Sequence, residues 1–189
     1  MANFSAVYDA CVLYPAPLRD LLMQLALSDL FRARWTQDIH EEWMRNVAKE
    51  RPDLSQVQLN RTRELMDAHV RDCLVKGYRE IIPSLQLPDD NDRHVLAAAI
   101  VAGADVIVTY NLADFPADDL EPYGIEAQHP DEFITHLIDL APSAVCTAAA
   151  TVRARLRSPP RSVDEYLDIL QRQRLSQTVA ELRPFAHLL

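Results

Sequence analysis

Short apolar runs alternate along this chain with longer segments whose apolar residues recur at helical spacing. Four runs have the length and composition of buried strands, at residues 4–8, 78–85, 104–110 and 124–128. Helical spacing is found between them, at residues 18–31, 38–49, 54–71, 91–102 and 130–140. Strands that alternate with helices indicate parallel βαβ units. The pattern therefore predicts a three-layer α/β/α sandwich around a mostly parallel central sheet.

The pattern changes after Pro142. Residues 143–157 are typical of a helix, an SPPRS segment interrupts it, and the rest of the chain predicts one or two further helices. Ser162 and Glu165 have the spacing of a capping box at the start of that last stretch. The tail is too small to fold alone. We therefore predict an α/β domain over residues 1–140 and a C-terminal helical extension over residues 141–189 that packs on the core or on a partner.

Size and composition predict a single globular core in a cytoplasmic protein. The chain has 189 residues, of which 49% are hydrophobic. No run approaches the ~18 to 20 apolar residues that cross a bilayer, so no membrane association is expected. The first residues lack the basic stretch of a signal peptide. The cysteines, at 11, 73 and 146, are odd in number and far apart, which indicates reduced thiols acting as small apolar fillers.

Charge is unevenly distributed along the chain. The net charge is −9, which argues against indiscriminate nucleic-acid binding. Residues 1–140 carry 24 acids and 12 basic residues, whereas residues 141–189 carry seven arginines and four acids. An acidic body with a basic tail still allows a polyanion to bind, provided that a metal neutralises the acids and arginines line the rim.

Four acids stand where predicted strands end or helices begin: Asp9, Glu42, Asp92 and Asp114. Open α/β sheets place their ligand crevice at the carboxyl ends of the strands, so these acids are expected to converge there. Carboxylates gathered in one crevice repel each other unless a cation joins them, and Mg²⁺ or Mn²⁺ prefers oxygen ligands. The pattern predicts a divalent metal site that serves phosphodiester chemistry.

The choices of Glu42 and of Asp92 among neighbouring acids rest on the local signals that mark helix starts. Asp38 and Glu41 have the spacing of a capping box, which would give Glu41 a structural role and leave Glu42 as the metal-site acid. Asp92 is preferred over Asp89 and Asp90 because the small-residue helix after it would pack closely on the sheet. The alternative for all three is simple complementation of a helix N-terminus.

The segment after the strand at 104–110 supplies the fourth acid. Asp114 is the main candidate there, and an ordinary Asx turn is its structural alternative. Asn111, as a ligand or an orienting group, and Asp90 are further candidates for the metal site. His40 and His94 adjoin site acids but are interpreted as structural.

Other phosphate chemistries are disfavoured by missing residues. The chain contains neither GxGxxG nor GxxxxGK[ST], which excludes Rossmann dinucleotide and P-loop sites. Phosphatases and receiver domains with a phosphorylated Asp need a nearby lysine, but residues 77–189 contain none. They also need an acid where this chain has Cys11.

The segments VYDACVLYP, HEEW, DDNDRHVLAAA and VTYNLADF, in this order, resemble the PIN-domain family over residues 4–140. Within that family the chain is most similar to the VapC-type ribonuclease toxins of bacterial toxin–antitoxin pairs. The resemblance implies a Mg²⁺/Mn²⁺ site at Asp9, Glu42, Asp92 and Asp114, RNA as substrate, a cognate antitoxin and a homodimer. Many relatives carry a hydroxyl residue after the first Asp, which supports a metal-bound water. This chain has Ala10 at that position, and Thr109 could supply the support instead.

Two functions follow from these observations. The first is a metal-dependent endoribonuclease, the toxin of such a pair. The second is a non-catalytic RNA- or protein-binding regulatory module with a vestigial acidic pocket. Arg153, Arg155, Arg157 and Arg161 could contact RNA phosphates or an antitoxin, or could form a solvated face. No local motif encodes the choice of RNA.

Overall fold

The central sheet has four parallel strands. A computed structural model describes residues 4–189 and places these strands at Ser5–Tyr8 (β1), Arg32–Arg34 (β2), Val106–Val108 (β3) and Glu126–Gln128 (β4). Their order across the sheet is β2-β1-β3-β4, and each neighbouring pair is parallel. Because β1 and β3 are the central pair, the segments that follow them leave the sheet side by side.

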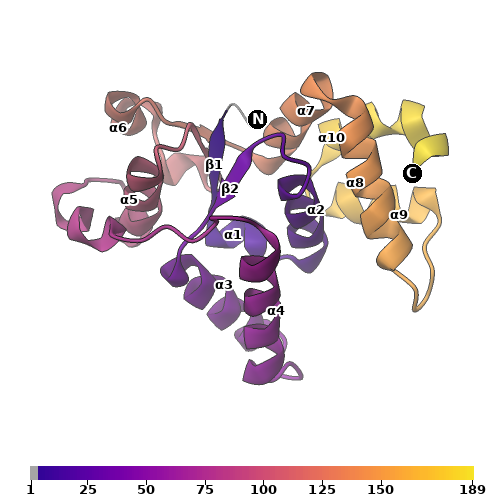
Figure 1. The fold of residues 1–189 in the computed structure, drawn as a ribbon, viewed down its shortest axis with the longest axis horizontal. Coiled ribbons are helices and arrows are strands. Elements are labelled where there is room, and N and C mark those ends of the chain that lie inside the picture. The colour runs from indigo at the N-terminus through magenta and orange to yellow at the C-terminus, as the bar shows by residue number, and fades with distance from the viewer. Residues whose placement is uncertain (1–3) are drawn as a thin grey trace.

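Helices cover both faces of this sheet, with α5 on one side of the strands and α2 on the other (Figure 1). The helices are α1 (Ala10–Leu13), α2 (Ala16–Ala26), α3 (Gln37–Glu50), α4 (Gln56–His69), α5 (Arg93–Ala102), α6 (Ala117–Leu120), α7 (Pro130–Leu140), α8 (Pro142–Arg155), α9 (Val163–Arg172) and α10 (Ser176–Leu182). Short 3₁₀ turns lie at Tyr78–Glu80, Ile82–Ser84, Asp90–Asp92, Leu112–Asp114, Glu121–Tyr123 and Arg183–Leu188. The predicted three-layer α/β fold with added C-terminal helices is confirmed.

The predicted strand at residues 78–85 is wrong. That segment forms two 3₁₀ turns, and the missing strand is β2, whose sequence is Arg-Ala-Arg. Pro83 lacks the N–H that a strand ladder needs, and Gly77 turns the chain with a positive φ of 77°. β2 lacks an apolar run because it lies at the edge of the sheet, where only Ala33 is buried.

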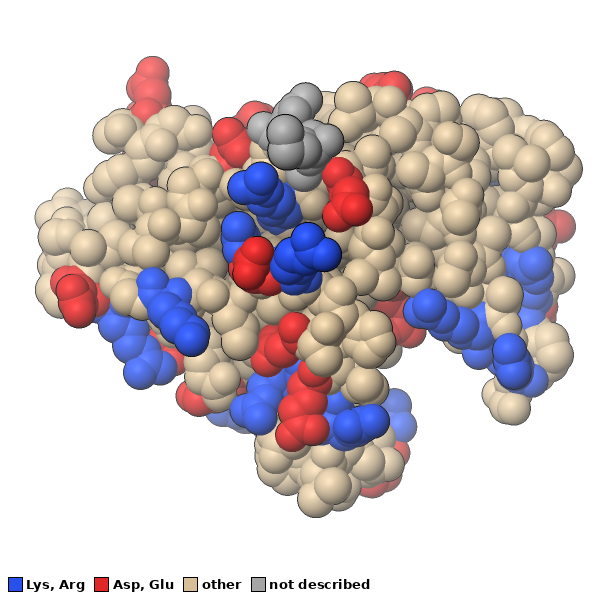
Figure 2. Space-filling model, viewed as in Figure 1, with Lys and Arg blue, Asp and Glu red and all other residues tan. Residues whose placement is uncertain are grey.

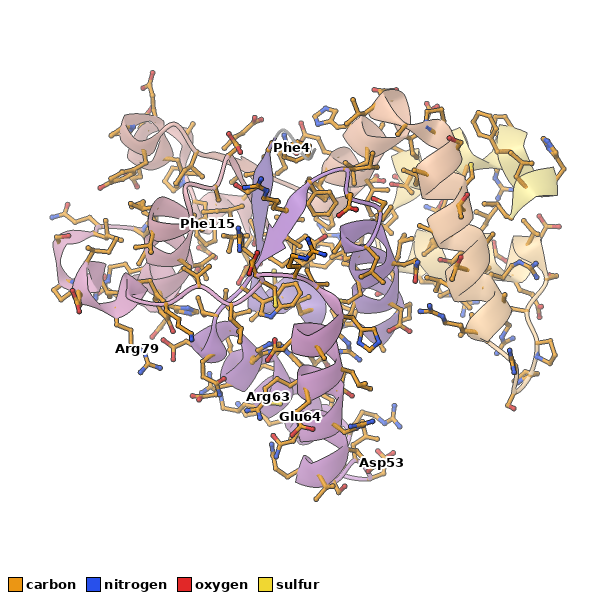
Figure 3. The ribbon with its side chains drawn as sticks, in the orientation of Figure 1. Phe4, Asp53, Arg63, Glu64, Arg79 and Phe115 are labelled. Carbon is orange, nitrogen blue, oxygen red and sulfur yellow. The ribbon has the colours of Figure 1, made fainter. Side chains whose placement is uncertain are left out.

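An aromatic cluster joins the sheet to α7. Phe4 lies at the start of β1 (Figure 3), and its ring is 5.7 Å from that of Phe31. Phe133 of α7 packs edge-on against Phe31, with ring centroids 5.1 Å apart, and also against Tyr8 of β1. These rings are buried or half-buried and hold α7 on the sheet.

The C-terminal helices pack on the α/β body. α8 lies against α2, α10 lies against α7, and one hydrophobic cluster runs from the sheet into α8, α9 and α10. The predicted capping box of Ser162 and Glu165 is confirmed at the start of α9. The boundary between residues 140 and 141 stays a prediction. Among residues 4–189 no helix is both long and apolar enough to span a bilayer.

Candidate functional site

A cleft opens at the carboxyl edge of the sheet. Asp9 directly follows β1 and Thr109 directly follows β3. The cleft has a volume of about 610 Å³ and is lined by Asp38, Glu41, Glu42, Arg45, Asp89, Asn91, Asp92, His94, Asn111 and Asp114. Six of these ten residues are acids. The fold therefore brings together segments that are about a hundred residues apart in the sequence.

Asp9 is held by two side chains that donate to the same carboxylate oxygen. Thr109 Oγ1 donates to Asp9 Oδ2 at 2.7 Å, and Cys11 Sγ donates to it at 3.0 Å. Asp9 is only 3% exposed, and this burial raises its pKa above the usual range. Both side-chain donors use Oδ2. Thr109 thus places a hydroxyl against Asp9, and its suggested role in place of a hydroxyl at position 10 stays a prediction.

Cys11 is part of the site, and its interpretation as an apolar filler is wrong. Its sulfur also lies 3.3 Å from Thr109 Oγ1 and accepts the backbone N–H of Tyr110 at 3.2 Å. Burial beside Asp9 raises the pKa of the Cys11 thiol, so it stays protonated and donates. The only sequence signal was its position two residues after Asp9, in the first turn of α1.

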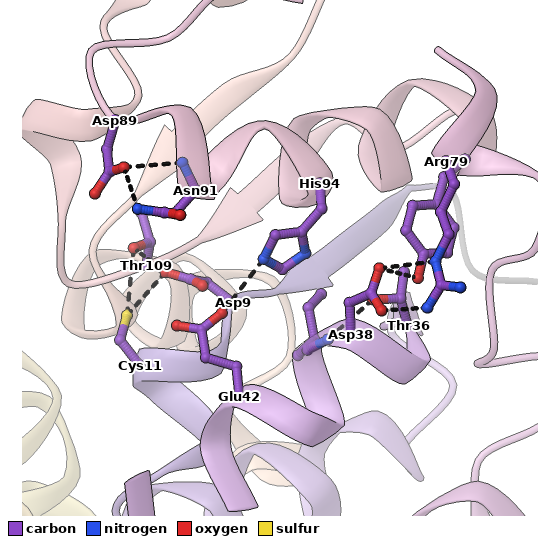
Figure 4. A network of polar contacts seen from close by, with 12 residues as sticks. Asp9, Cys11, Thr36, Asp38, Glu42, Arg79, Asp89, Asn91, His94 and Thr109 are labelled. Atoms are coloured by element: carbon purple, nitrogen blue, oxygen red, sulfur yellow. Dashed lines mark hydrogen bonds and ion pairs between the residues drawn. The ribbon is translucent and has the colours of Figure 1, made fainter. Parts of the chain in front are cut away.

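The start of α3 differs from the prediction. Thr36, not Asp38, is the N-cap, and its hydroxyl accepts the backbone N–H of Ile39 at 3.1 Å. The Asp38 carboxylate instead accepts Tyr78 Oη at 2.7 Å and pairs with Arg79, as the right of Figure 4 shows. Glu41 is exposed and accepts a hydrogen bond from Gln37. Glu41 therefore has no capping role, and that argument for Glu42 fails.

Burial and contacts, rather than a capping role of its neighbour, distinguish Glu42 from Glu41. Glu42 is half-buried, and its Oε2 lies 3.3 Å from His94 Nε2 on α5 (Figure 4). It also lies close enough to Asp9 to raise the pKa of that carboxyl. The charge of Glu42 also raises the pKa of Asp92, whereas Glu41, which lines the same cleft, is exposed.

A buried polar network fixes the first turn of α3. His40 is fully buried, and its Nε2 lies 2.9 Å from Asp67 Oδ1 on α4. Trp43 Nε1 can only donate, and it lies 2.9 Å from His40 Nδ1. His40 is therefore neutral, with its proton on Nε2, and burial lowers its pKa. Its contacts support the structural interpretation of His40.

Asp92 occupies the N-cap position of α5 without making a capping hydrogen bond. Burial, followed by the charges of Asp9, Asp89, Asp114 and Glu42, raises the pKa of Asp92 to about 7. These charges act on Asp92 because the four carboxyl groups lie near it. The four predicted site acids therefore converge.

The other two candidates for the metal site, Asn111 and Asp90, differ in their position relative to the cleft. Asn111 lines the cleft, and its backbone N–H donates to Thr109 Oγ1 at 3.0 Å. Asp90 is exposed, does not line the cleft and lies 3.4 Å from Arg93. Asp89 accepts the backbone N–H of Asn91 and so caps the turn before α5.

The residues of this cleft suit a hard divalent cation. The metal-binding atoms of the predicted set are all oxygens, which such a cation prefers. Within residues 4–189, no three His, Cys, Asp or Glu side chains already stand at metal-ligand spacing. Side-chain rotation would have to bring the carboxylates together around an ion.

The sheet order, the flanking helices and the convergent acids are those of a PIN-type nuclease fold, and comparison with known proteins agrees. The family model described as PIN domain matches residues 5–113, and the one described as VapC50 C-terminal domain matches residues 130–184. The chain belongs to the PIN-domain family.

The chain is also similar to an individual relative from Mycobacterium tuberculosis (strain ATCC 25618 / H37Rv), described as "Putative ribonuclease VapC50". The two are 40% identical over 97 residues, which cover 51% of this chain and 57% of the relative. The chain thus matches little more than half the length of that relative. No solved structure matches the chain. The resemblance to VapC-type proteins is confirmed.

Proposed function

We propose that this chain is a Mg²⁺- or Mn²⁺-dependent endoribonuclease that hydrolyses RNA phosphodiester bonds. The observation that carries the proposal is that Glu42, Asp92 and Asp114 line one cleft at the carboxyl edge of the sheet. Asp9, buried at the end of β1, lies close enough to raise the pKa of Asp92. Membership of the PIN-domain family and the similarity to a relative described as a ribonuclease support it.

Each residue has a role that follows from its contacts. Asp9, Asp92, Glu42 and Asp114 would hold the ion, and Asn111 would orient a ligand at the rim. A bound divalent cation would supply positive charge at the scissile phosphate and lower the pKa of water. Thr109 and Cys11 fix Asp9 Oδ2 in place, and His94 orients the Glu42 carboxylate. Such supporting hydrogen bonds typically alter metal affinity or activity by ~10 to 100-fold.

The direct test is cleavage of labelled RNA by the purified chain with Mg²⁺, with Mn²⁺ and with EDTA. We expect Asp9→Asn to reduce the cleavage rate by at least ~100-fold while the protein stays folded, because one carboxylate of the site is neutralised. Circular dichroism and melting temperature check the fold. Asp118→Asn, on the surface of α6, is the matched control and should cleave normally. Undiminished cleavage by Asp9→Asn, or full activity in EDTA, would contradict the proposal.

The biological role that we propose is the toxin of a toxin–antitoxin pair in the cytoplasm, acting as a homodimer and inhibited by a cognate antitoxin. The match to the VapC50 C-terminal domain over residues 130–184 supports this role. Expression of the chain should arrest growth, and expression of the antitoxin gene expected beside it should relieve the arrest. Light scattering would measure the dimer.

The second candidate function is a regulatory module that binds RNA or protein through a vestigial pocket. The observation in its favour is that the carboxylates do not stand at metal-ligand spacing. Calorimetric titration with Mn²⁺, combined with the cleavage assay, separates the two functions. Metal binding without cleavage of any RNA would favour the module.

A further inference from the structure

The turn between α9 and α10 docks beside the cleft. Tyr110 lies between Thr109, which holds Asp9, and Asn111, which lines the cleft. Its hydroxyl donates to the backbone carbonyl of Gln173 at 2.7 Å. The next residue, Arg174, places its guanidinium carbon 5.3 Å from the centre of the Tyr110 ring. The C-terminal extension therefore reaches the strand end that holds the site acids.

Arg174 offers a cation that no residue of the described chain neutralises. Its side chain is exposed and makes no ion pair or side-chain hydrogen bond with any of residues 4–189. Stacking on Tyr110 occupies one face of the guanidinium. Its N–H donors lie in the plane of the group and stay available, in a geometry that suits a phosphate.

The backbone holds Arg174 in a conformation that arginine disfavours. Its φ is +61°, in the left-handed region. The other non-glycine residues with positive φ within residues 4–189 are both aspartates, Asp29 and Asp72, a residue type that tolerates this region better. The turn is nonetheless well fixed, because Asp131 accepts the backbone N–H groups of Gln177 and Thr178 at the start of α10. An outlier that its surroundings hold in place is a reason to seek a function.

Two other arginines of the C-terminal part are engaged by groups of the protein. Basic side chains gather at the end of α8 and along the loop that leads to α9 (Figure 2). Arg153 in this region donates to the backbone carbonyls of Leu189 and Arg161 and so ties the C-terminus down. Arg161 lies 3.4 Å from Glu165. Arg174 differs from these two in combining an unpaired cation with a fixed position beside the cleft.

We propose that Arg174 binds an RNA phosphate next to the scissile one, so that the C-terminal extension completes the substrate site. The acidic cleft repels a polyanion, and Arg45 is the one arginine among its lining residues. A cation at the edge of the cleft would hold the RNA backbone while the acids hold the metal. This inference rests on the proposed ribonuclease function, but it concerns binding and can be measured without cleavage.

The test is the affinity of a fluorescently labelled single-stranded RNA, measured by anisotropy from 50 to 300 mM KCl with Mg²⁺ present. All proteins carry Asp9→Asn, so that cleavage does not interfere. Arg174→Gly removes the cation and introduces the residue that φ favours, so the protein should fold normally. Arg174→Lys keeps the charge. Arg183→Ala is the control, since Arg183 is also exposed on the C-terminal part.

We expect Arg174→Gly to weaken RNA binding by roughly 5-fold and to reduce the salt-dependence slope by about 0.7, the value for one phosphate contact on a single strand. Arg174→Lys should recover most of the slope, and Arg183→Ala should match the parent protein. A slope for Arg174→Gly equal to that of the parent would overturn the inference.

Cleavage by the chain without Asp9→Asn is followed in parallel. If RNA is cut while Arg174→Gly leaves binding unchanged, the inference fails and the ribonuclease proposal stands. If the slope changes as expected but no RNA is cut, the Arg174 contact stands and the ribonuclease proposal fails.

Discussion

Asp9 and Asp131 are both buried aspartates, yet their surroundings are opposite. Asp131 is 5% exposed and accepts the backbone N–H groups of Gln177 and Thr178 at 2.9 and 2.8 Å, at the positive end of α10. Asp9 is 3% exposed and accepts side-chain hydrogen bonds from Thr109 and Cys11, while the acids Glu42 and Asp92 lie near it. One carboxylate joins two parts of the fold. The other lies beside like charges, an arrangement that would destabilise the fold unless a cation is bound.

The largest loss of stability is expected when the Asp131 carboxylate, which joins α7 to α10, is removed. Asp131→Ala leaves the backbone N–H groups of Gln177 and Thr178 without their partner, and that of Thr178 is buried. The substitution should lower the free energy of unfolding by about 2–4 kcal/mol. Urea denaturation measures the loss. Asp139→Ala, at an exposed position of the same helix, should change it by less than ~0.5 kcal/mol. Equal effects of the two substitutions would mean that Asp131 does not join α7 to α10.

The second effect concerns metal addition. A cation bound by the folded cleft stabilises the protein by about 2.7 kcal/mol when its concentration is 100 times the dissociation constant. We therefore expect Mn²⁺ to raise the melting temperature of the chain. Asp9→Asn should remove most of this increase. Asp131→Ala should show the same increase, starting from a lower melting temperature in the absence of metal. An increase that survives Asp9→Asn would place the ion elsewhere.

A smaller effect of opposite sign is expected at Asp92. Asp92→Asn removes a charge that four neighbouring acids repel, so the metal-free protein should become more stable. Because the side chain is only half-buried, solvent screening limits the gain to roughly 1 kcal/mol. The same substitution should lower both Mn²⁺ affinity and cleavage. A loss of metal-free stability would show that Asp92 acts as a structural cap.

The smallest expected effect is the change of stability with pH that comes from His40, a buried side chain that is neutral. Its pKa is lowered by burial from the ordinary value of 6.5, so below that pH the unfolded chain binds a proton that the folded protein does not. This contribution to stability is complete above pH 6.5 and is lost as the pH falls through the folded-state pKa. Unfolding at pH 7.5 and 5.5 measures it, with His40→Gln as the comparison. Parallel pH dependence in both proteins would rule out His40.

Sequence patterns alone are enough to predict the class of fold and the main candidate acids. Helical spacing, together with apolar runs at 4–8, 104–110 and 124–128, indicated parallel βαβ units, because a strand buried on both faces must be apolar throughout. The acids that follow such strands are local features, and so Asp9, Asp92 and Asp114 could be named as candidates. Helix α7 was predicted with its observed bounds, Pro130–Leu140.

Which side chains contact each other depends on how the elements pack, and sequence patterns do not reveal it. β2 was missed because an edge strand needs no apolar run, and the cap of α3 was misassigned because Tyr78 and Arg79, forty residues away, compete for Asp38. Thr109 and Cys11 share an oxygen of Asp9 only once β1 and β3 are neighbours. Arg174 reaches Tyr110 only once Asp131 has fixed α10. The spacing of residues along a chain specifies its helices and strands. Hydrogen bonds between residues a hundred positions apart depend on how those elements pack.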